Sequence, residues 1–514
     1  MLSITPRDYQ QTIFATATKH NTLVVLPTGL GKTLIALLLA IHRKKQFPTS
    51  KILFLAPTRP LVEQHFNYFK KHLSELFADL QLFTGEVPAK ERQKIWQTAE
   101  IIFSTPQCIA NDLEHYLYDT KDISLLIIDE AHRCLKNYDY TKVVDFYKRQ
   151  AQHQRILGLT ASPGSDPEIV NQICKHLDIH EIELRTRYSE DVKDYLQELD
   201  FTKIEVPFPQ EFIELRVLFT RIWDSCIDKL KSSNYLIGPA NKITLLKLQN
   251  RLAMQVSQRN FAAMHGMSLT AQAIKISHAL ELLETQTLSG LNTYLKGLIK
   301  QASEKKSKAV QNLTKSPEFN AALISLQSLL TKKTEHPKIE ELAVITENEL
   351  KENKQAKIMI FTQFRDTAST ILKRLSQITE AKPAMFVGQA KKTSASGNTG
   401  LSQKEQKAVI EQFKNNEINI LIATSIGEEG LDIPEVSAVI FYEPVPSAIR
   451  KIQRAGRTAR LAPGKLMILV TRDTRDEAHH YAAAAREKKM HKTIHAIKEE
   501  LKERNKTKTL KDFS

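Results

Sequence analysis

The segment SLLIIDEAHRCL, residues 124–135, places two adjacent acids, Asp129 and Glu130, directly behind a run of apolar residues. A run that is apolar at every position is typical of a strand in a parallel sheet that is covered on both faces. Ligands of such sheets bind at the carboxyl ends of the strands. The segment therefore predicts an α/β fold with a ligand site beside Asp129 and Glu130.

A second apolar strand runs into a glycine-containing turn in NTLVVLPTGLGKTLIALLLAI, residues 21–41. Its centre, TGLGKT, matches a phosphate-binding loop, in which glycines let successive backbone N–H groups and a helix N-terminus face an anion. The strict pattern has glycine where this chain has Leu26, so a glycine turn with a solvated lysine stays open as an alternative. The predicted nucleotide-binding residues of the loop are Thr28, Gly29, Leu30, Gly31, Lys32 and Thr33.

The two segments together predict an ATPase. Lys32 would reach the β- and γ-phosphates, and Thr33 and Asp129 would bind Mg²⁺. Glu130 would orient and deprotonate the attacking water, so that each of the adjacent acids has its own task. The expected cofactors are therefore ATP and Mg²⁺.

The composition is that of a globular protein with an excess of positive charge. The chain has 514 residues, a hydrophobic content of 42% and a net charge of +15. A chain of this length is expected to form about two to four domains. The positive charge favours a polyanionic partner such as nucleic acid, although it can also serve solubility alone.

The cysteines and the apolar runs argue against two further classes of protein. The four cysteines form no CxxC pair, which disfavours a zinc site or a disulfide framework and fits a reducing cytosol. The longest apolar run, at 34–41, is too short to span a bilayer, and the N-terminus has no apolar leader. We expect a cytoplasmic, nucleoid-associated protein with no membrane partner.

Four regions differ in their apolar patterns. Apolar strands alternate with helical stretches over residues 1–195 and again over 336–475, which predicts two parallel sheets flanked by helices. Between them, residues 196–335 have helix-like apolar spacing and few glycines, which predicts an inserted all-helical domain. Residues 476–514 form a basic helical tail, in which one helical face carries Met490, Ile494, Ile497 and Leu501.

Six further segments extend the pattern of motifs. They are LAPTRPLVEQ (55–64), STPQ (104–107), LGLTASP (157–163), IFTQFR (360–365), IATSIGEEGLDIP (422–434) and QRAGRTAR (453–460). With them, the chain resembles the superfamily 2 helicases of the DEAH type. FVGQ (386–389), GLSQKEQ (400–406) and TSIGEEGLDIP (424–434) give a narrower similarity to the archaeal Hef helicases and the Fanconi-anaemia M-type DNA translocases.

This resemblance implies an architecture and an activity. The family has two RecA-like lobes with a helical insertion between them. It uses ATP to remodel or unwind branched DNA, such as stalled forks and junctions, in DNA repair or replication restart. The lysines of the insertion would then act as a clamp or wedge against DNA, although a solvated helix face explains them equally well.

The resemblance also implies roles around the nucleotide. Arg7 and Gln10 resemble the motif that reads adenine, and Asp432 would meet the ribose. Arg457 and Arg460 resemble arginine fingers, which would stabilise charge on the γ-phosphate from the second lobe.

Two further groups of residues follow from the family pattern. His132 would couple the nucleotide site to the second lobe through Gln453, and Thr160 and Ser162 belong to the same coupling group. A motor must grip any sequence, so its contacts should be to phosphates. The expected nucleic-acid contacts are Thr58, Arg59 and Thr105 in the first lobe and Thr362 and Thr424 in the second.

The expected partner is forked or branched DNA. Leu510 and Phe513 faintly resemble the sliding-clamp-binding peptides of archaeal replication proteins. Full-length Hef proteins carry a nuclease that this sequence does not encode, so we expect no nuclease activity, and a separate nuclease is a candidate partner.

Two other functions stay open. An ATP-dependent RNA helicase or double-stranded RNA translocase of the RIG-I/Dicer type shares the DEAH-like box and the helical insertion, although no RNA-end-binding domain is recognisable. A nucleic-acid scaffold without hydrolysis is disfavoured by the intact Lys32, Asp129, Glu130 and Arg457.

Overall fold

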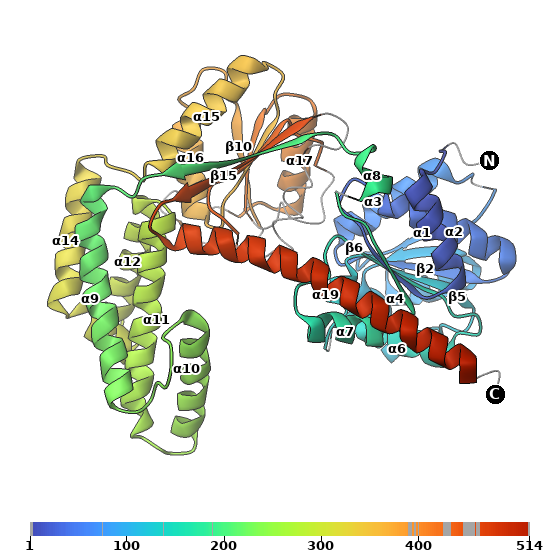
Figure 1. Ribbon diagram of the computed structural model, residues 1–514, viewed down its shortest axis with the longest axis horizontal. Coiled ribbons are helices and arrows are strands. Elements are labelled where there is room, and N and C mark those ends of the chain that lie inside the picture. The colour runs from blue at the N-terminus through green and yellow to red at the C-terminus, as the bar shows by residue number, and fades with distance from the viewer. Residues whose placement is uncertain are drawn as a thin grey trace.

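The computed structural model describes residues 4–388 apart from 75, 137 and 188, and then 393–394, 397–398, 400–424, 433–445, 458 and 463–511. The side chains of 393–394, 397–398 and 504–511 are not among those described. The chain forms two lobes that each contain a parallel sheet, a helical domain, and a long C-terminal helix (Figure 1).

Lobe 1 contains a seven-stranded parallel sheet with the strand order β3-β4-β2-β5-β6-β1-β7. Its strands are β1 (Thr22–Val25), β2 (Lys51–Leu55), β3 (Leu80–Phe83), β4 (Ile101–Ser104), β5 (Ile123–Ile128), β6 (Ile156–Thr160) and β7 (Glu181–Leu184). Its helices are α1 (Asp8–Lys19), α2 (Lys32–Gln46), α3 (Arg59–His72), α4 (Ala89–Thr98), α5 (Pro106–Glu114), α6 (Asp139–Gln150), α7 (Pro167–His176) and α8 (Glu190–Lys193), with a 3-10 turn at Ala131–Arg133.

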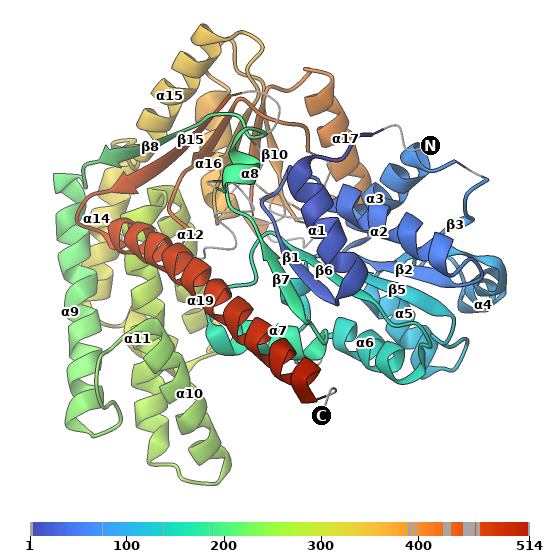
Figure 2. The ribbon, with the colours of Figure 1, turned by 45° about the vertical axis from the view of Figure 1, so that its right-hand side comes forward.

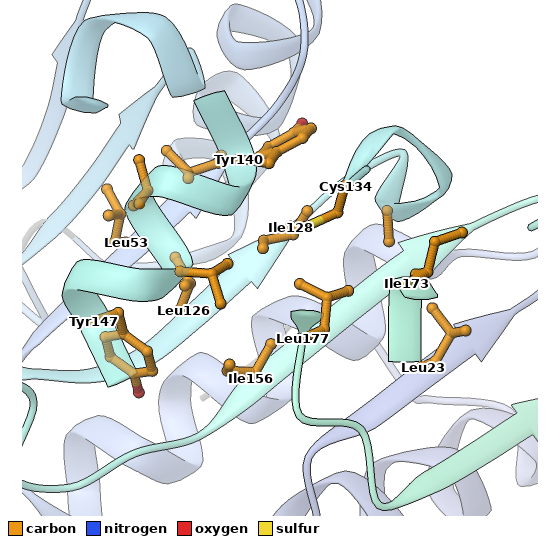
Figure 3. Packing of buried hydrophobic residues seen from close by; sticks show 14 of the residues in the cluster. Leu23, Leu53, Leu126, Ile128, Cys134, Tyr140, Tyr147, Ile156, Ile173 and Leu177 are labelled. Carbon is orange, nitrogen blue, oxygen red and sulfur yellow. The ribbon is translucent and has the colours of Figure 1, made fainter. Parts of the chain in front are cut away.

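The central strand β5 is buried along its whole length. Successive side chains of a strand point to opposite faces of the sheet, and here both faces are covered. Leu126 and Ile128 pack with Tyr140 and Tyr147 of α6 in one core (Figure 3). Leu125 and Ile127, which share the opposite face of the strand, pack in a second core against other helices. The predicted doubly covered strand is therefore confirmed.

Lobe 2 contains a six-stranded parallel sheet with the strand order β10-β13-β9-β14-β15-β8. Its strands are β8 (Leu199–Val206), β9 (Ile358–Phe361), β10 (Pro383–Phe386), β13 (Ile420–Ala423), β14 (Ala438–Phe441) and β15 (Gly464–Thr471). Its helices are α15 (Lys338–Glu352), α16 (Arg365–Leu375) and α17 (Gln403–Lys414), and β11 (Thr393–Ser394) pairs with β12 (Gly397–Asn398). The predicted fold class, two parallel-sheet lobes with helices between them, is confirmed.

Strand β8 corrects one expected boundary. The sequence places residues 196–335 in the helical insertion, whereas Leu199–Val206 pairs with β15 along its entire length. Most of its side chains are exposed or only partly buried, because it lies at the edge of the described sheet. Such a strand lacks the continuous apolar run by which buried parallel strands are recognised.

The helical domain lies between β8 and α15 in the chain. Its helices are α9 (Gln210–Ser232), α10 (Lys242–Ser257), α11 (Ala263–Thr285), α12 (Leu288–Ser303), α13 (Lys308–Thr314) and α14 (Pro317–Thr331). They share one apolar core, which includes Phe212, Phe219 and Phe319. Within the described part of the chain, no helix combines the length and the apolar character that crossing a bilayer requires.

The helical domain joins lobe 2 through a buried polar junction. The Lys338 side chain is 0% exposed, and its ammonium donates to Asp476 Oδ2 at 2.6 Å. It also donates to the backbone oxygens of Thr285 at 2.8 Å and Tyr442 at 3.1 Å. These partners come from the end of α11, from the segment after β14 and from the start of the C-terminal helix, so one side chain ties three parts of the chain together.

The C-terminal helix α19 (Arg475–Lys511) starts at this junction and runs back to lobe 1 (Figures 1 and 2). Met490, Ile494 and Ile497 are buried in a lobe 1 core, and Leu501 packs against it. The predicted apolar face of the tail is thus confirmed, and its partner is the side of lobe 1 that carries α7 and β7 (Figure 2).

Candidate nucleotide-binding site

The phosphate loop, residues 26–31, joins β1 to α2. Gly31 has a φ of +77°, a backbone conformation that L side chains rarely adopt. A Cβ at this position would lie 2.4 Å from the Gln10 amide nitrogen, so there is no room for a side chain. The carbonyl oxygen of Leu30 accepts hydrogen bonds from Gln10 Nε2 at 3.1 Å and from the Tyr9 hydroxyl at 2.9 Å. Helix α1 therefore holds the loop in its curved conformation.

Lys32 and the loop residues other than Gly31 differ in their burial and in their polar contacts. Lys32 is the first residue of α2, and its ammonium donates to the backbone oxygen of Leu26 at 2.9 Å. Leu26 itself is fully buried in the core, so its side chain contributes to packing where the strict motif has glycine. Gly29 supplies a second positive φ of +87°. The Thr28 hydroxyl is buried and has no hydrogen-bond partner within the described part of the chain.

Asp129 and Glu130 follow β5 and are 5% and 8% exposed. Asp129 Oδ2 accepts a hydrogen bond from His65 Nε2 at 2.8 Å, and its backbone oxygen accepts one from the Tyr140 hydroxyl at 2.7 Å. Burial alone would raise the pKa of Asp129, but His65 and Lys32 hold that pKa below its ordinary value. The carboxylate is therefore ionised, as binding of a cation requires.

Glu130 begins a chain of polar contacts. Its backbone has a φ of +50°, and such left-handed conformations of residues other than glycine cluster at functional sites. Glu130 Oε2 lies 3.3 Å from His132 Nδ1, which lies 3.1 Å from Thr160 Oγ1. That oxygen accepts a hydrogen bond from the Ser162 backbone N–H at 3.1 Å, and the Ser162 hydroxyl donates to Met490 Sδ in α19. The structure thus brings His132, Thr160 and Ser162 together.

His65 is a member of the site that the sequence did not reveal. It lies in α3, and its Nδ1 is 3.3 Å from the Thr33 hydroxyl, while its Nε2 contacts Asp129. Its position just past the segment 55–64 is a weak signal by itself. The contact depends on β2 lying next to β5 in the sheet, and strand order cannot be read from a single sequence.

The donor set of the site fits Mg²⁺. Thr33 and Asp129 offer a hydroxyl and a carboxylate, and Mg²⁺ prefers such oxygen ligands together with phosphate oxygens. Glu130 Oε2 is buried and makes no hydrogen bond of good geometry with the described residues. Such an atom would accept a hydrogen bond from a water molecule if Mg²⁺ were bound by Thr33 and Asp129.

Arg7 and Gln10 lie next to the phosphate loop. The Gln10 side chain is 4% exposed, and its Oε1 accepts a hydrogen bond from the Arg7 backbone N–H at 2.9 Å. The guanidinium of Arg7 lies over the Tyr195 ring, 4.9 Å from its centroid. Both residues thus contribute to the loop's support, and their contact with adenine stays a prediction.

Several predicted residues lie outside the described part of the chain. They are Asp432, Gln453, Arg457, Arg460 and Phe513, together with the side chain of Leu510. Their assigned roles stay predictions.

The predicted nucleic-acid contacts lie where strands end. Thr58 and Thr105 directly precede α3 and α5, and Thr362 and Thr424 directly follow β9 and β13. The hydroxyls of Thr58 and Thr362 are buried and lack a hydrogen-bond partner among the described residues. Both lobes therefore hold an unused hydroxyl at the carboxyl edge of the sheet.

Arg59 is engaged by acids in this structure. Its guanidinium donates to Glu63 at 2.7 Å and also pairs with Glu86. Lys407 of lobe 2 lies 3.2 Å from Glu63, which makes this cluster a direct contact between the lobes. A phosphate that binds Arg59 would have to replace one of these carboxylates.

Comparisons with known proteins agree with this geometry. Residues 7–170 match the family model of DEAD/DEAH box helicases, and residues 338–462 match that of the helicase conserved C-terminal domain. The crystal structure of the Pyrococcus furiosus Hef helicase domain superposes with a TM-score of 0.70 and 39% identity, covering 93% of this chain and 98% of that chain. The chain belongs to the DEAD/DEAH box helicases. It is therefore an ATP-hydrolysing enzyme of this family.

Other helicases are similar over most of this chain. The ATP-dependent DNA helicase fml1 of Schizosaccharomyces pombe is 35% identical, covering 92% of this chain and 57% of that protein. The ATP-dependent DNA helicase mph1 of Neurospora crassa is 33% identical, covering 93% and 42%. A Methanocaldococcus jannaschii protein provisionally named an ATP-dependent RNA helicase is 38% identical, covering 95% and 60%. The helicase chain thus spans about 60% or less of the length of these relatives.

The helical domain has a match of its own. Residues 212–334 match a helical-bundle family described for ATP-dependent RNA helicases. The matched range begins within α9 and ends just after α14, so it coincides with the helical domain of this helicase.

Proposed function

We propose that this helicase uses ATP to translocate on, and to remodel or unwind, branched DNA such as stalled forks and junctions, in DNA repair or replication restart. The observation that carries the proposal is the convergence of Lys32, Thr33, Asp129 and Glu130 at the carboxyl edge of lobe 1. The choice of DNA is supported by the two named DNA helicases, which are similar over more than nine-tenths of this chain.

ATP would bind with its phosphates against the loop at 26–31. The backbone N–H groups at the start of α2 and the Lys32 ammonium provide positive charge for the β- and γ-phosphates. Thr33 and Asp129 would hold Mg²⁺, which neutralises charge on the phosphate oxygens when bound. Glu130 would orient the attacking water and accept its proton, because its Oε2 is buried beside Asp129 and makes no hydrogen bond of good geometry with a described residue.

The second lobe would complete the nucleotide site. Arg457 and Arg460 would reach the γ-phosphate, where a planar guanidinium stabilises spread negative charge. Asp432 would meet the ribose, and Arg7 and Gln10 would lie at the adenine.

The contacts from Glu130 through His132 to Thr160 and Ser162 would change when the bound nucleotide is hydrolysed. His132 lies within reach of both Glu130 and Thr160, so a shift of Glu130 would change the contact between His132 and Thr160. Gln453 of the second lobe would join this path. Hydrolysis would thereby alter the contact between the lobes.

The grip on the strand would come from phosphate contacts. Thr58 and Thr362 offer hydroxyls, one in each lobe, that have no hydrogen-bond partner in the described part of the chain, and Thr105 and Thr424 lie at other strand ends. Arg59 would exchange a carboxylate partner for a phosphate. Alternate gripping by two lobes moves a strand one step per cycle of closing and opening.

The proposed setting is the cytoplasm, beside the nucleoid. The partners that we propose beyond DNA are a sliding clamp, through Leu510 and Phe513, and a separate nuclease. Both rest on the sequence alone.

The test is ATP turnover by the full chain, measured against forked DNA, linear duplex DNA and structured RNA of equal nucleotide content. We expect forked DNA to give the largest stimulation, and the Lys32→Ala variant provides the background. Stimulation mainly by RNA would favour the alternative, an RNA helicase or double-stranded RNA translocase, which the names of the Methanocaldococcus relative and of the helical-bundle family support. The absence of stimulation by all three would contradict both functions.

A further inference from the structure

His65 touches both residues to which we assign the metal. It lies in the second turn of α3, is 7% exposed, and packs on the Phe54 ring with a centroid distance of 4.4 Å. Its Nε2 is 2.8 Å from Asp129 Oδ2, and its Nδ1 is 3.3 Å from Thr33 Oγ1. The two ring nitrogens thus connect the phosphate loop to the acids behind β5.

The hydrogen positions follow from the chemistry of the partners. An ionised carboxylate only accepts hydrogen bonds, so Nε2 must carry the hydrogen that points to Asp129. In a neutral imidazole the other nitrogen is an acceptor, so the Thr33 hydroxyl donates to Nδ1. This arrangement turns the Thr33 hydrogen toward His65 and leaves the oxygen lone pairs for another partner.

We propose that His65 is a positioning residue that orients both metal-binding side chains at once. It takes the hydrogen of Thr33, so that the oxygen presents lone pairs, and it fixes the Asp129 carboxylate through Oδ2. The inference rests on the proposed function, in which Thr33 and Asp129 hold Mg²⁺. Groups that orient metal ligands in this way typically contribute about 10- to 100-fold to metal affinity.

A purely structural role for His65 makes a different prediction. If the ring serves only to fill space beside Phe54, then phenylalanine should replace it, because that ring has a similar shape and can pack in the same place. If the two hydrogen bonds matter, then glutamine should replace it better, because its amide both donates and accepts. The two substitutions therefore separate packing from orientation.

The experiment measures the Mg²⁺ concentration that gives half-maximal tight binding of a fluorescent ADP analogue to the full chain. We expect His65→Phe to raise this midpoint about 10- to 100-fold and to leave the weak binding seen in EDTA unchanged. We expect His65→Gln to keep the midpoint within about threefold of the unmodified chain. Val62→Ala is the matched control, because Val62 is a buried residue of the same helix with no polar side chain.

The outcomes distinguish the positioning role of His65 from the assignment of Thr33 and Asp129 as metal ligands. A midpoint for His65→Phe within about twofold of the unmodified chain would overturn the positioning role. Asp129→Asn tests the metal assignment itself. If Asp129→Asn also leaves the midpoint unchanged, then the assigned metal ligands are wrong; if it shifts the midpoint while His65→Phe does not, only the role of His65 fails.

A second measurement does not depend on the folding of His65→Phe. In the full chain labelled with ¹⁵N-histidine, the ring signal missing from His65→Gln belongs to His65. We expect this ring to carry its hydrogen at Nε2, with Nδ1 as an acceptor, both in the free protein and with Mg²⁺ and ADP bound. A hydrogen at Nδ1 would contradict the proposed hydrogen bond from Thr33.

Discussion

Lys32 and Lys338 occupy opposite kinds of environment, although both donate to backbone oxygens deep in the fold. The Lys338 side chain is 0% exposed, pairs with Asp476, and has an acceptor for each of its three hydrogens. Lys32 is partly exposed and bonds to the backbone of the very loop that it follows. Removing one partner of the sealed Lys338 pair would leave a buried charge unpaired, whereas the partly exposed Lys32 lies at the end of a phosphate-binding loop, where it can reach a ligand.

The difference has a general physical basis. A buried charge costs several kcal/mol unless it is paired and fully hydrogen-bonded, so a complete set of partners indicates a structural role. Lys32 lacks such an enclosure, because it is partly exposed at the start of α2, where the N-terminus of a helix favours an anion. We therefore expect substitution of Lys32 to lower ATP turnover and substitution of Lys338 to lower the free energy of unfolding.

Lys32→Ala should have the largest effect, and it should be on catalysis. Loss of one positioned donor to a transferring phosphate lowers turnover by about 10²–10³-fold or more. The free energy of unfolding should change by about 1 kcal/mol, because the lost hydrogen bond is donated by a partly exposed ammonium. Measurements of ATP turnover and of urea unfolding on the same preparation check the expected loss of activity and the expected small change in stability.

Lys338→Ala should show the reverse pattern. Removing one member of a buried ion pair typically costs about 3–5 kcal/mol, so the midpoint of urea unfolding should fall sharply. Turnover per folded molecule should stay near that of the unmodified chain at low temperature. Replacing both partners, as Lys338→Met with Asp476→Leu, should recover about half of the loss or more. A double variant no more stable than Lys338→Ala would contradict the ion-pair explanation.

Ile494→Ala tests the apolar contact between α19 and lobe 1. Ile494 is fully buried, and truncation of such a side chain costs about 2–5 kcal/mol. We expect the second half of α19 to become sensitive to protease while lobe 1 stays folded. The exposed residue Tyr481 of the same helix provides the control, because Tyr481→Ala should leave protease sensitivity unchanged.

Glu281 gives a smaller effect that depends on pH. Burial would raise its pKa, but His278 and Lys242 lower it to about 2. A carboxyl group with a depressed pKa stabilises the fold above its ordinary value of about 4.5 and loses that contribution as the pH falls toward 2. Glu281→Gln should therefore cost at most about 3 kcal/mol at pH 7 and less at pH 3. If urea unfolding shows that Glu281→Gln lowers the free energy of unfolding equally at pH 7 and pH 3, the lowered pKa of Glu281 is contradicted.

Much of this architecture could be predicted because it depends on local patterns. The apolar strand before Asp129 and the glycine turn before Lys32 each have a chemical reason that a sequence displays directly. Residues 199–206 gave no such signal, because an exposed edge strand carries few apolar side chains. The apolar face of α19 was visible in the sequence, but its docking on lobe 1 was not, since the pattern shows that a face packs and not where.

The residues of the candidate site likewise fall into those that a local motif predicts and those that only the folded structure reveals. Lys32, Asp129, Glu130 and His132 belong to short motifs whose spacing carries the chemistry. His65 reaches Asp129 only because β2 lies beside β5, and that neighbourhood is a product of the folded sheet. Residue spacing along one segment cannot encode a contact that depends on strand order.

We propose separate tasks for the adjacent acids Asp129 and Glu130, and one measurement tests this division most directly. The affinity for ATP with Mg²⁺ and the rate of turnover are measured for Asp129→Asn and Glu130→Gln. We predict that Glu130→Gln keeps the affinity within about threefold and loses about 10²–10⁴-fold in turnover, whereas Asp129→Asn loses the Mg²⁺-dependent affinity. Turnover by Glu130→Gln within tenfold of the unmodified chain would contradict the account.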